Sequence, residues 1–160
     1  MAGDIWLEIN LDFLKHNLDK LKNEMKDQAI MAVLKGDAYG HSIEEVAKFI
    51  EDDVDYFAVG LQDEAIELRT ICPRKPILIM SPYFEPNIAL DFDLTPCVDN
   101  IQDLIKLSKK AAAENKIAKF HLKINTGMNR FGMKVNEIPE FISIFSNLEN
   151  ICLEGIFSHF

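Results

Sequence analysis

Basic residues and long apolar runs are scarce in this sequence, and each scarcity excludes a class of function. The 160 residues contain 17 Lys and Arg against 26 Asp and Glu, which gives a formal net charge of -9. Because no basic stripe is available to displace counterions from phosphates, we expect no nucleic-acid partner. No stretch approaches the roughly 18 consecutive apolar residues of a membrane-spanning helix, so we expect no membrane partner either.

Cysteine is also scarce. Cys72, Cys97 and Cys152 are odd in number, lie far apart and form no CxxC pair. This usage is typical of reduced thiols rather than of a disulfide framework or a zinc site, so we expect no metal. The N-terminus lacks the basic segment followed by an apolar segment that marks a secretory signal. We therefore expect a cytoplasmic protein.

Glycine and proline are few, at 7 and 6 residues, while hydrophobic residues make up 48% of the chain. A chain of this size and composition can bury a real core as one globular domain. Two glycine motifs are absent, the dinucleotide fingerprint GxGxxG and the phosphate loop GxxxxGK[ST]. Their absence argues against an open sheet that binds nucleotides.

Short apolar runs recur along the chain and predict six strands, over residues 30–35, 56–60, 76–81, 94–98, 119–125 and 153–159. Between them, apolar residues spaced by three and four predict helices over 11–25, 43–50 and 101–108. Ser42 and Glu45 form a capping box, and Asn136 with Pro139 marks a further helix start.

A strand followed by a helix, six times over, indicates parallel strands with crossover helices. An open doubly wound sheet and a (β/α)₈ barrel both fit this pattern. A complete barrel needs about 250 residues. We therefore predict an α/β fold in which residues 1–160 form an incomplete (β/α)₈ barrel with about six of its eight strands.

The fifth predicted strand alternates apolar and polar residues. Phe120, Leu122 and Ile124 should face the helices, which leaves His121, Lys123 and Asn125 pointing into the barrel. An inward lysine is costly unless it is neutralised or paired. The alternative is an exposed edge strand with a polar outer face.

The first predicted strand ends on Lys35, and carboxyl ends of barrel strands are where catalytic groups lie. An amine withdrawn from water there can attack a carbonyl. Gly36 and Gly40 allow close backbone approach to a ligand, and the helix after Ser42 offers its N-terminus to a phosphate. An amine beside a phosphate site suits pyridoxal phosphate. The alternative is a lysine that simply anchors the strand end in solvent.

Two more candidates lie at the same predicted end of the barrel. Arg130 lies in the loop TGMNRFG, residues 126–132, where its planar guanidinium could reach an anionic oxygen. His159 ends the sixth strand. Their alternatives are a solvated loop arginine and a structural histidine. His16 is expected on the surface, and His41 in loop or cap structure.

Five segments of the sequence resemble one family of enzymes. They read WLEINLDFLKHN at 6–17, AVLKGDAYGH at 32–41, GLQDEA at 60–65, FHLKINTGMNRFG at 120–132 and GIFSHF at 155–160. In this order they resemble the N-terminal barrel domain of alanine racemases, which are fold-type III pyridoxal phosphate enzymes. Gly36 stands where this family usually has alanine, and Asn125 where aspartate is common.

The resemblance implies a role for each candidate. Lys35 would hold pyridoxal 5'-phosphate covalently and act as the base for the α-proton of the D-enantiomer. Tyr39 would contact the cofactor phosphate. Arg130 would lie near the phenolic oxygen of the cofactor and the substrate carboxylate. Lys123 would carry a carbamate that orients Arg130, and His159 would lie below the cofactor ring.

The resemblance also implies parts beyond Phe160. These are the arginine on the pyridine nitrogen, most of the phosphate site, and a tyrosine for the opposite face from a C-terminal β domain across a homodimer interface. We therefore expect residues 1–160 alone not to racemise alanine, although the full-length homodimer would supply D-alanine for bacterial peptidoglycan.

Three alternatives share this resemblance. The first is a serine or broad-specificity racemase. The second is an amino acid decarboxylase, although those enzymes lack the AYGH continuation and the TGMxRxG loop. The third is a barrel that binds pyridoxal phosphate without catalysis.

Overall fold

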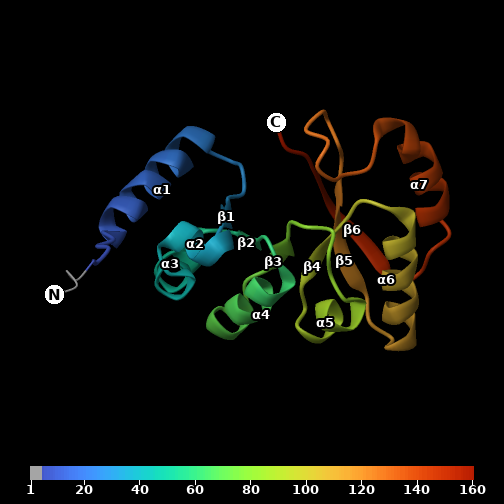
Figure 1. Cartoon of the computed structure of the whole chain (residues 1–160), viewed down its shortest axis with the longest axis horizontal. Coiled ribbons are helices and arrows are strands. Elements are labelled where there is room, and N and C mark those ends of the chain that lie inside the picture. The colour runs from blue at the N-terminus through green and yellow to red at the C-terminus, as the bar shows by residue number, and fades with distance from the viewer. Residues whose placement is uncertain (1–4) are drawn as a thin grey trace.

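A computed structural model describes residues 5–160 and contains one sheet of six parallel strands (Figure 1). The strands follow chain order across the sheet, as β1 Met31–Val33, β2 Tyr56–Val59, β3 Ile77–Ile79, β4 Thr95–Val98, β5 Ala118–Lys123 and β6 Ile151–Phe157. The helical segments are α1 Leu11–Met25, α2 Lys35–Gly40, α3 Ile43–Ile50, α4 Gln62–Ile71, α5 Pro86–Asp91, α6 Ile101–Ala113 and α7 Ile138–Phe145, with short 3₁₀ turns η1 Glu51–Asp53 and η2 Val135–Glu137. The predicted incomplete barrel is confirmed.

Side-chain caps begin three of the helices. The side chain of Asn10 accepts the Phe13 amide at the start of α1, and Asn100 accepts the Asp103 amide at the start of α6. Ser42 Oγ accepts the Glu45 amide at 3.4 Å, so the predicted Ser42 cap of α3 is confirmed. These bonds satisfy amides that have no partner within a helix.

The predicted helix start with Pro139 in its first turn is confirmed, but Asn136 is not its capping residue. Asn136 lies inside the 3₁₀ turn η2, and α7 begins only at Ile138 with Pro139 in its first turn. Glu137 accepts the Lys134 amide at 2.9 Å and so organises this start instead. A capping residue needs extended backbone, which a residue within a helical turn does not have.

The helix-facing side of the sheet is packed with apolar residues in two clusters, one around β1 to β3 and one around β4 to β6. In the second cluster Phe120 lies edge-on to Phe141 and Phe145, with ring centroids 6.4 and 5.8 Å apart. His121 and Lys123 are buried on the opposite face of β5. The predicted assignment of faces in this strand is therefore confirmed for residues 120–123.

A polar layer fills the inner face below these residues. The Tyr56 hydroxyl lies 2.7 Å from Thr95 Oγ1 and donates to Glu154 Oε2 at 2.6 Å. Burial, followed by the nearby Glu154 carboxylate, raises the pKa of Tyr56. The His121 ring lies against Tyr56, and a Cβ at Gly155 would stand 2.6 Å from that ring. Glycine at 155 therefore makes room for a buried histidine.

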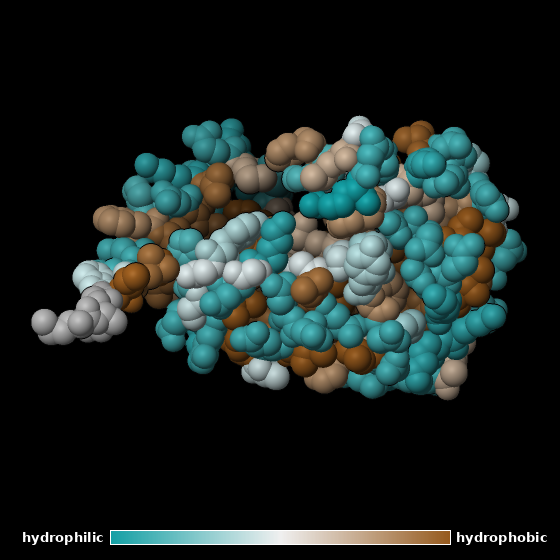
Figure 2. Space-filling view, in the orientation of Figure 1, coloured by the Kyte–Doolittle hydropathy of each residue, from teal (hydrophilic) through white to brown (hydrophobic). Residues whose placement is uncertain are grey.

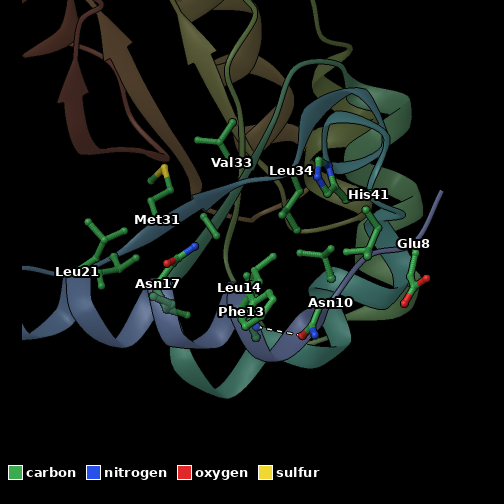
Figure 3. Close-up of a pocket in the computed structure, with 16 residues that line it drawn as sticks. Glu8, Asn10, Phe13, Leu14, Asn17, Leu21, Met31, Val33, Leu34 and His41 are labelled. Carbon is green, nitrogen blue, oxygen red and sulfur yellow. Dashed lines mark hydrogen bonds between the residues drawn. The ribbon is translucent and has the colours of Figure 1, made fainter.

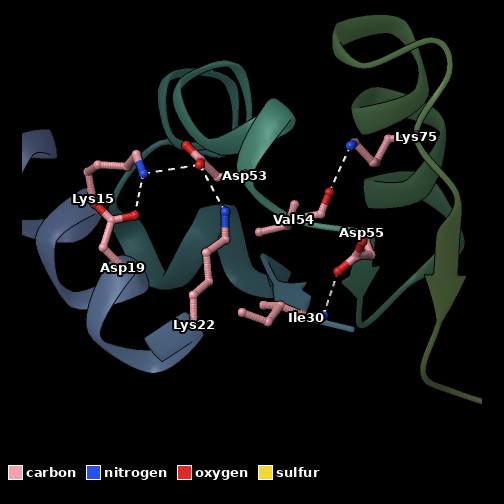
Figure 4. Close-up of polar contacts among 8 residues, drawn as sticks. All are labelled: Lys15, Asp19, Lys22, Ile30, Asp53, Val54, Asp55 and Lys75. Carbon is pink, nitrogen blue, oxygen red and sulfur yellow. Dashed lines mark hydrogen bonds and ion pairs between the residues drawn. The ribbon is translucent and has the colours of Figure 1, made fainter. Parts of the chain in front are cut away.

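Helix α1 lies beyond β1 at one end of the sheet (Figure 1). Lys15 and Lys22 on α1 both contact Asp53 Oδ1, at 3.0 and 2.9 Å (Figure 4). Asp55 accepts the Ile30 amide at 2.8 Å just before β1. The two lysine contacts attach α1 to η1, and the Asp55 bond holds the segment that leads into β1.

An apolar groove of about 820 Å³ runs between α1 and β1 (Figure 3). Phe13, Leu14 and Leu21 line it from α1, and Met31 and Val33 from β1. Hydrophobic residues also gather beside the N-terminal end of the described chain (Figure 2). Within residues 5–160, no helix has the length and apolar character needed to cross a bilayer.

Candidate active site

One cavity at the carboxyl ends of the strands brings most of the predicted residues together. It has a volume of about 280 Å³ and is lined by Lys35, Lys123, Arg130 and His159. Gly60, Leu61, Met80, Ser81, Phe131 and Ser158 complete its lining. Tyr39 is not among the lining residues: it is 63% exposed, with its ring centroid 5.8 Å from Lys35 Nζ.

Lys35 lies just beyond the first strand rather than at its end. Strand β1 ends at Val33, and residues 36–39 follow with φ between 52° and 62°, a left-handed turn. Such backbone costs roughly 1–2 kcal/mol for each residue other than glycine. The turn is held by hydrogen bonds, because the Ala38 amide donates to the Leu34 carbonyl at 2.8 Å and Asp37 accepts the Ile43 amide at 2.7 Å.

The same bonds change the expectation for the start of α3. The Ile43 amide is taken by Asp37, and the Glu45 amide by Ser42. Two of the amides predicted to face a phosphate are therefore already satisfied by side chains. His41 Nδ1 lies 2.9 Å from the Ala38 carbonyl, so His41 belongs to the cap structure, as predicted.

Lys123 is 5% exposed and lies between aromatic rings. Its Nζ is 4.4 Å from the Phe157 ring centroid and 5.3 Å from that of Phe131. Among residues 5–160 it has no carboxylate within 4.0 Å. Burial lowers the pKa of Lys123, an effect that Cys97 opposes and the Arg130 charge reinforces.

Asn125 does not point into the barrel, which corrects the prediction from alternation. Strand β5 ends at Lys123, and the Asn125 side chain turns into the following loop. Its Oδ1 accepts the amides of Gly127 and Asn129 at 3.1 and 3.2 Å. Alternation ceases to predict side-chain direction once the backbone leaves the extended conformation.

The loop that carries Arg130 is fastened at its far end. Asp99, just after β4, accepts the Gly132 amide at 2.9 Å. Gly132 has φ of 119°, and a Cβ there would lie 2.8 Å from the Asn125 nitrogen. The Arg130 guanidinium lies 4.8 Å from the Phe131 ring centroid. Arg130 is exposed on a loop whose backbone is held by the bond from Gly132 to Asp99.

His159 lines the cavity but follows β6 by two residues, rather than ending the sixth strand as predicted. Its carbonyl accepts the Thr126 hydroxyl at 3.1 Å, which joins this segment to the loop after β5. The His159 ring is exposed and lies 5.2 Å from the Phe160 ring, measured between centroids. The surface of this region mixes polar and apolar residues (Figure 2).

Sequence reasoning missed two acids at this end of the sheet. Glu64 Oε1 accepts the Gly36 amide at 2.6 Å, and its Oε2 accepts the amides of Gly60 and Leu61 at 2.8 and 2.9 Å. Asp99 is the second. Its position directly after a predicted strand was a usable signal, and Glu64 lies within the quoted GLQDEA segment.

Residues 9–160 match the family model described as "Alanine racemase, N-terminal domain". The chain belongs to the alanine racemase family. It is 41% identical over 159 residues to "Alanine racemase 1" of Caldanaerobacter subterraneus subsp. tengcongensis, an alignment that covers 96% of this chain and 41% of that protein. The chain therefore spans less than half the length of this curated relative.

Solved structures agree with the family assignment. The alanine racemase of Clostridium difficile 630 in complex with cycloserine superposes with a TM-score of 0.90 at 37% identity, covering 100% of this chain and 45% of that one. A histidine racemase from Leuconostoc mesenteroides subsp. sake superposes with a TM-score of 0.83 at 26% identity, covering 91% and 40%. The fold is thus shared by racemases with different named substrates.

The chemistry of the lining residues fits pyridoxal phosphate. The cavity offers the primary amine of Lys35, which an aldehyde requires, and the guanidinium of Arg130, which suits an anionic oxygen. The flat aromatic side chain of Phe131 also lines it. The lining therefore contains an amine and a cation of the kinds that pyridoxal phosphate would need.

Proposed function

We propose that this chain supplies the cofactor-binding part of a pyridoxal-phosphate-dependent isomerase that interconverts L-alanine and D-alanine. The observation that carries the proposal is that Lys35, Lys123, Arg130 and His159 line one cavity in a chain of this family. Residues 1–160 would be the N-terminal part of the barrel domain. Two further βα units and a C-terminal β domain would complete the enzyme.

Each side chain has a stated task in this proposal. The cofactor, when bound, withdraws electrons from the amino acid and so acidifies its α-hydrogen. Lys35 holds the cofactor and accepts or returns that proton at Nζ on one face. Arg130 orients the substrate carboxylate and the phenolic oxygen of the cofactor with its planar fork. Tyr39 would contact the phosphate from the turn that follows Lys35, and His159 would lie below the ring.

Lys123 is proposed to carry a carbamate. The reaction joins the neutral amine to carbon dioxide and releases one proton, which leaves a negative charge near Arg130. The lowered pKa of Lys123 supports this role, since only the uncharged amine reacts. The new anion would pair with the Arg130 guanidinium and fix its direction.

The wider setting belongs to the same proposal. The complete enzyme would act as a homodimer in the cytoplasm and would supply D-alanine for peptidoglycan. A second candidate is a racemase for another amino acid, which the likeness to a histidine racemase favours. The two candidates share Lys35 and differ in the groups that surround the substrate side chain.

Borohydride trapping tests the proposal on the 160-residue chain. The chain is mixed with pyridoxal phosphate, reduced and digested, and the labelled lysine is identified by peptide mapping. We expect label on Lys35 and its loss in Lys35→Ala. Label on Lys123 in place of Lys35 would overturn the assignment.

A second measurement separates the substrates. The chain with pyridoxal phosphate is incubated in deuterium oxide with D-alanine, L-alanine or D-histidine, and loss of the α-hydrogen is followed by NMR, with Lys35→Ala as the control. Because Lys35 serves one face only, we expect exchange of D-alanine above that control, without racemisation. Racemisation within about tenfold of a typical enzyme turnover of about 10 s⁻¹ would contradict the need for a second base.

A further inference from the structure

We infer that Glu64 is a positioning residue that fixes the path of Lys35 into the cavity. The inference rests on the proposed function, in which Lys35 is the amine that holds the cofactor. Glu64 lies on a different helix, α4, and would contact neither cofactor nor substrate. It would act through the backbone of Gly36, which follows Lys35, and through the backbone of Gly60 and Leu61.

The Glu64 carboxylate joins two segments that are distant in sequence. Its Oε1 accepts the amide of Gly36, the residue directly after Lys35, at 2.6 Å. Its Oε2 accepts the amides of Gly60 and Leu61, which line the cavity, at 2.8 and 2.9 Å. Three amides thus converge on one carboxylate, and hydrogen bonds to a charged acceptor are the stronger kind.

The side chain of Lys35 passes through the space that this arrangement leaves. A Cβ built on Gly60 would lie 3.4 Å from Lys35 Cβ, 3.8 Å from Lys35 Cδ and 3.2 Å from Glu64 Oε2. The aliphatic stem of the lysine therefore lies directly against the Gly60 backbone. Because Glu64 holds Gly60 on one side and Gly36 on the other, it sets the direction in which the amine is presented.

The turn after Lys35 needs such a restraint. Its residues have left-handed backbone, and its far end is held by the bond from the Ile43 amide to Asp37. Glu64 provides the corresponding bond at the near end, beside the lysine. In Figure 1 the two helical segments involved, α2 and α4, lie next to each other.

A purely local role for Glu64 makes a different prediction. Glu64 occupies the third position of α4, and its bonds to Gly60 and Leu61 are those of a helix cap. A cap alone would stabilise α4 and leave Lys35 unaffected. A helix cap does not require the bond to Gly36. The test must therefore measure the turn and the lysine separately from the stability of α4.

The experiment compares Glu64→Ala and Glu64→Gln with Glu67→Gln, a control on the exposed side of the same helix. Circular dichroism and thermal unfolding establish that each variant is folded. Two quantities are then measured: the rate at which pyridoxal phosphate and borohydride label Lys35, with surface Lys48 as the internal reference, and the hydrogen-exchange rate of the Gly36 amide.

We expect Glu64→Ala to slow labelling of Lys35 relative to Lys48 by about tenfold and to speed Gly36 exchange by at least about tenfold, the effect of losing one charge-assisted hydrogen bond. Glu64→Gln keeps one carbonyl oxygen and should lie between Glu64→Ala and the unmodified chain. Glu67→Gln should match the unmodified chain. If Glu64→Ala does not fold, the same two rates in Glu64→Gln decide the question.

Unchanged labelling of Lys35 in a folded Glu64 variant would overturn the inference, as would unchanged exchange at Gly36. Failure of the proposed function gives a different result. In that case the unmodified chain is not labelled at Lys35 at all, while the dependence of Gly36 exchange on Glu64 still tests whether the carboxylate holds the turn.

Discussion

Replacing Lys123 with methionine should stabilise the folded chain. Lys123 is 5% exposed and, among the described residues, has no carboxylate within ion-pair distance. The faces of Phe157 and Phe131 lie against its ammonium, and Cys97 and Asp99 offset the charge more weakly than burial disfavours it. Methionine has a similar length and a flexible apolar chain, so Lys123→Met retains most of the packing and removes the buried charge.

The magnitude follows from two opposing contributions. Burying a neutral polar group without a full partner costs about 1–3 kcal/mol in mutational data, and a partly solvated ammonium costs at least that much. A cation over aromatic faces recovers about 0.5–2 kcal/mol, toward the upper figure when it is desolvated. The difference predicts that Lys123→Met raises the free energy of unfolding by about 1 kcal/mol near pH 7, when carbon dioxide is excluded.

The gain should depend on pH with a definite sign. The folded pKa of Lys123 lies below its ordinary value of 10.5, because burial disfavours the charge. Between the folded and unfolded pKa values the unfolded chain binds more protons, so the stability of the unmodified chain rises with pH in that window. The advantage of Lys123→Met is therefore fully present below the folded pKa and disappears as pH approaches 10.5.

Urea unfolding in carbon-dioxide-free buffer at several pH values measures both effects. The matched control is Lys119→Met on the same strand, where the ammonium is exposed and lies 2.8 Å from Glu154 Oε1. That control should change stability by less than about 1 kcal/mol, as for other surface ion pairs. A Lys123→Met chain that is no more stable than the unmodified chain near neutral pH would refute the reasoning.

Three further predictions concern the residues beneath and beside the cavity. Gly155→Ala places a Cβ 2.6 Å from the His121 ring and should cost about 1–3 kcal/mol in urea unfolding, and that cost should largely vanish in a His121→Ala background. Burial lowers the pKa of His121, so the free energy of unfolding should fall as pH drops below 6.5, a dependence that His121→Ala removes and replacement of exposed His16 by asparagine does not. Asp99→Ala deprives the Gly132 amide of its acceptor and should speed its hydrogen exchange about tenfold or more; unchanged exchange would show that Asp99 does not hold the loop.

Much of the architecture was accessible from local patterns. The spacing of Leu11 through Met25 predicted α1 with its observed bounds, and alternation in β5 predicted the buried positions of His121 and Lys123. Such patterns succeed because a helix or strand with one apolar face must turn that face to a core. The motifs around Lys35 and Arg130 indicated the family because each motif is contiguous in the sequence.

The site was predictable in its members but not in its geometry. Lys35 and His159 end predicted strands, Lys123 lies near the end of another and Arg130 follows that strand, and parallel strands bring their carboxyl ends together. Tyr39 was expected beside them, but the left-handed turn leaves it 63% exposed at the margin. Strand alternation could not predict the exposure of Tyr39, because alternation holds only where the backbone is extended.

The sequence by itself thus determined the succession of strands and helices and the faces of residues 120–123, which follow from local spacing, and it indicated the family through contiguous motifs. Three features were decided only by the tertiary structure. They are the left-handed turn after Lys35, the direction of the Asn125 side chain into its loop, and the hydrogen bond from the Gly36 amide to Glu64. That last bond joins residues 28 positions apart. Backbone conformations that are unfavourable in isolation are held by partners that only the folded chain brings within reach.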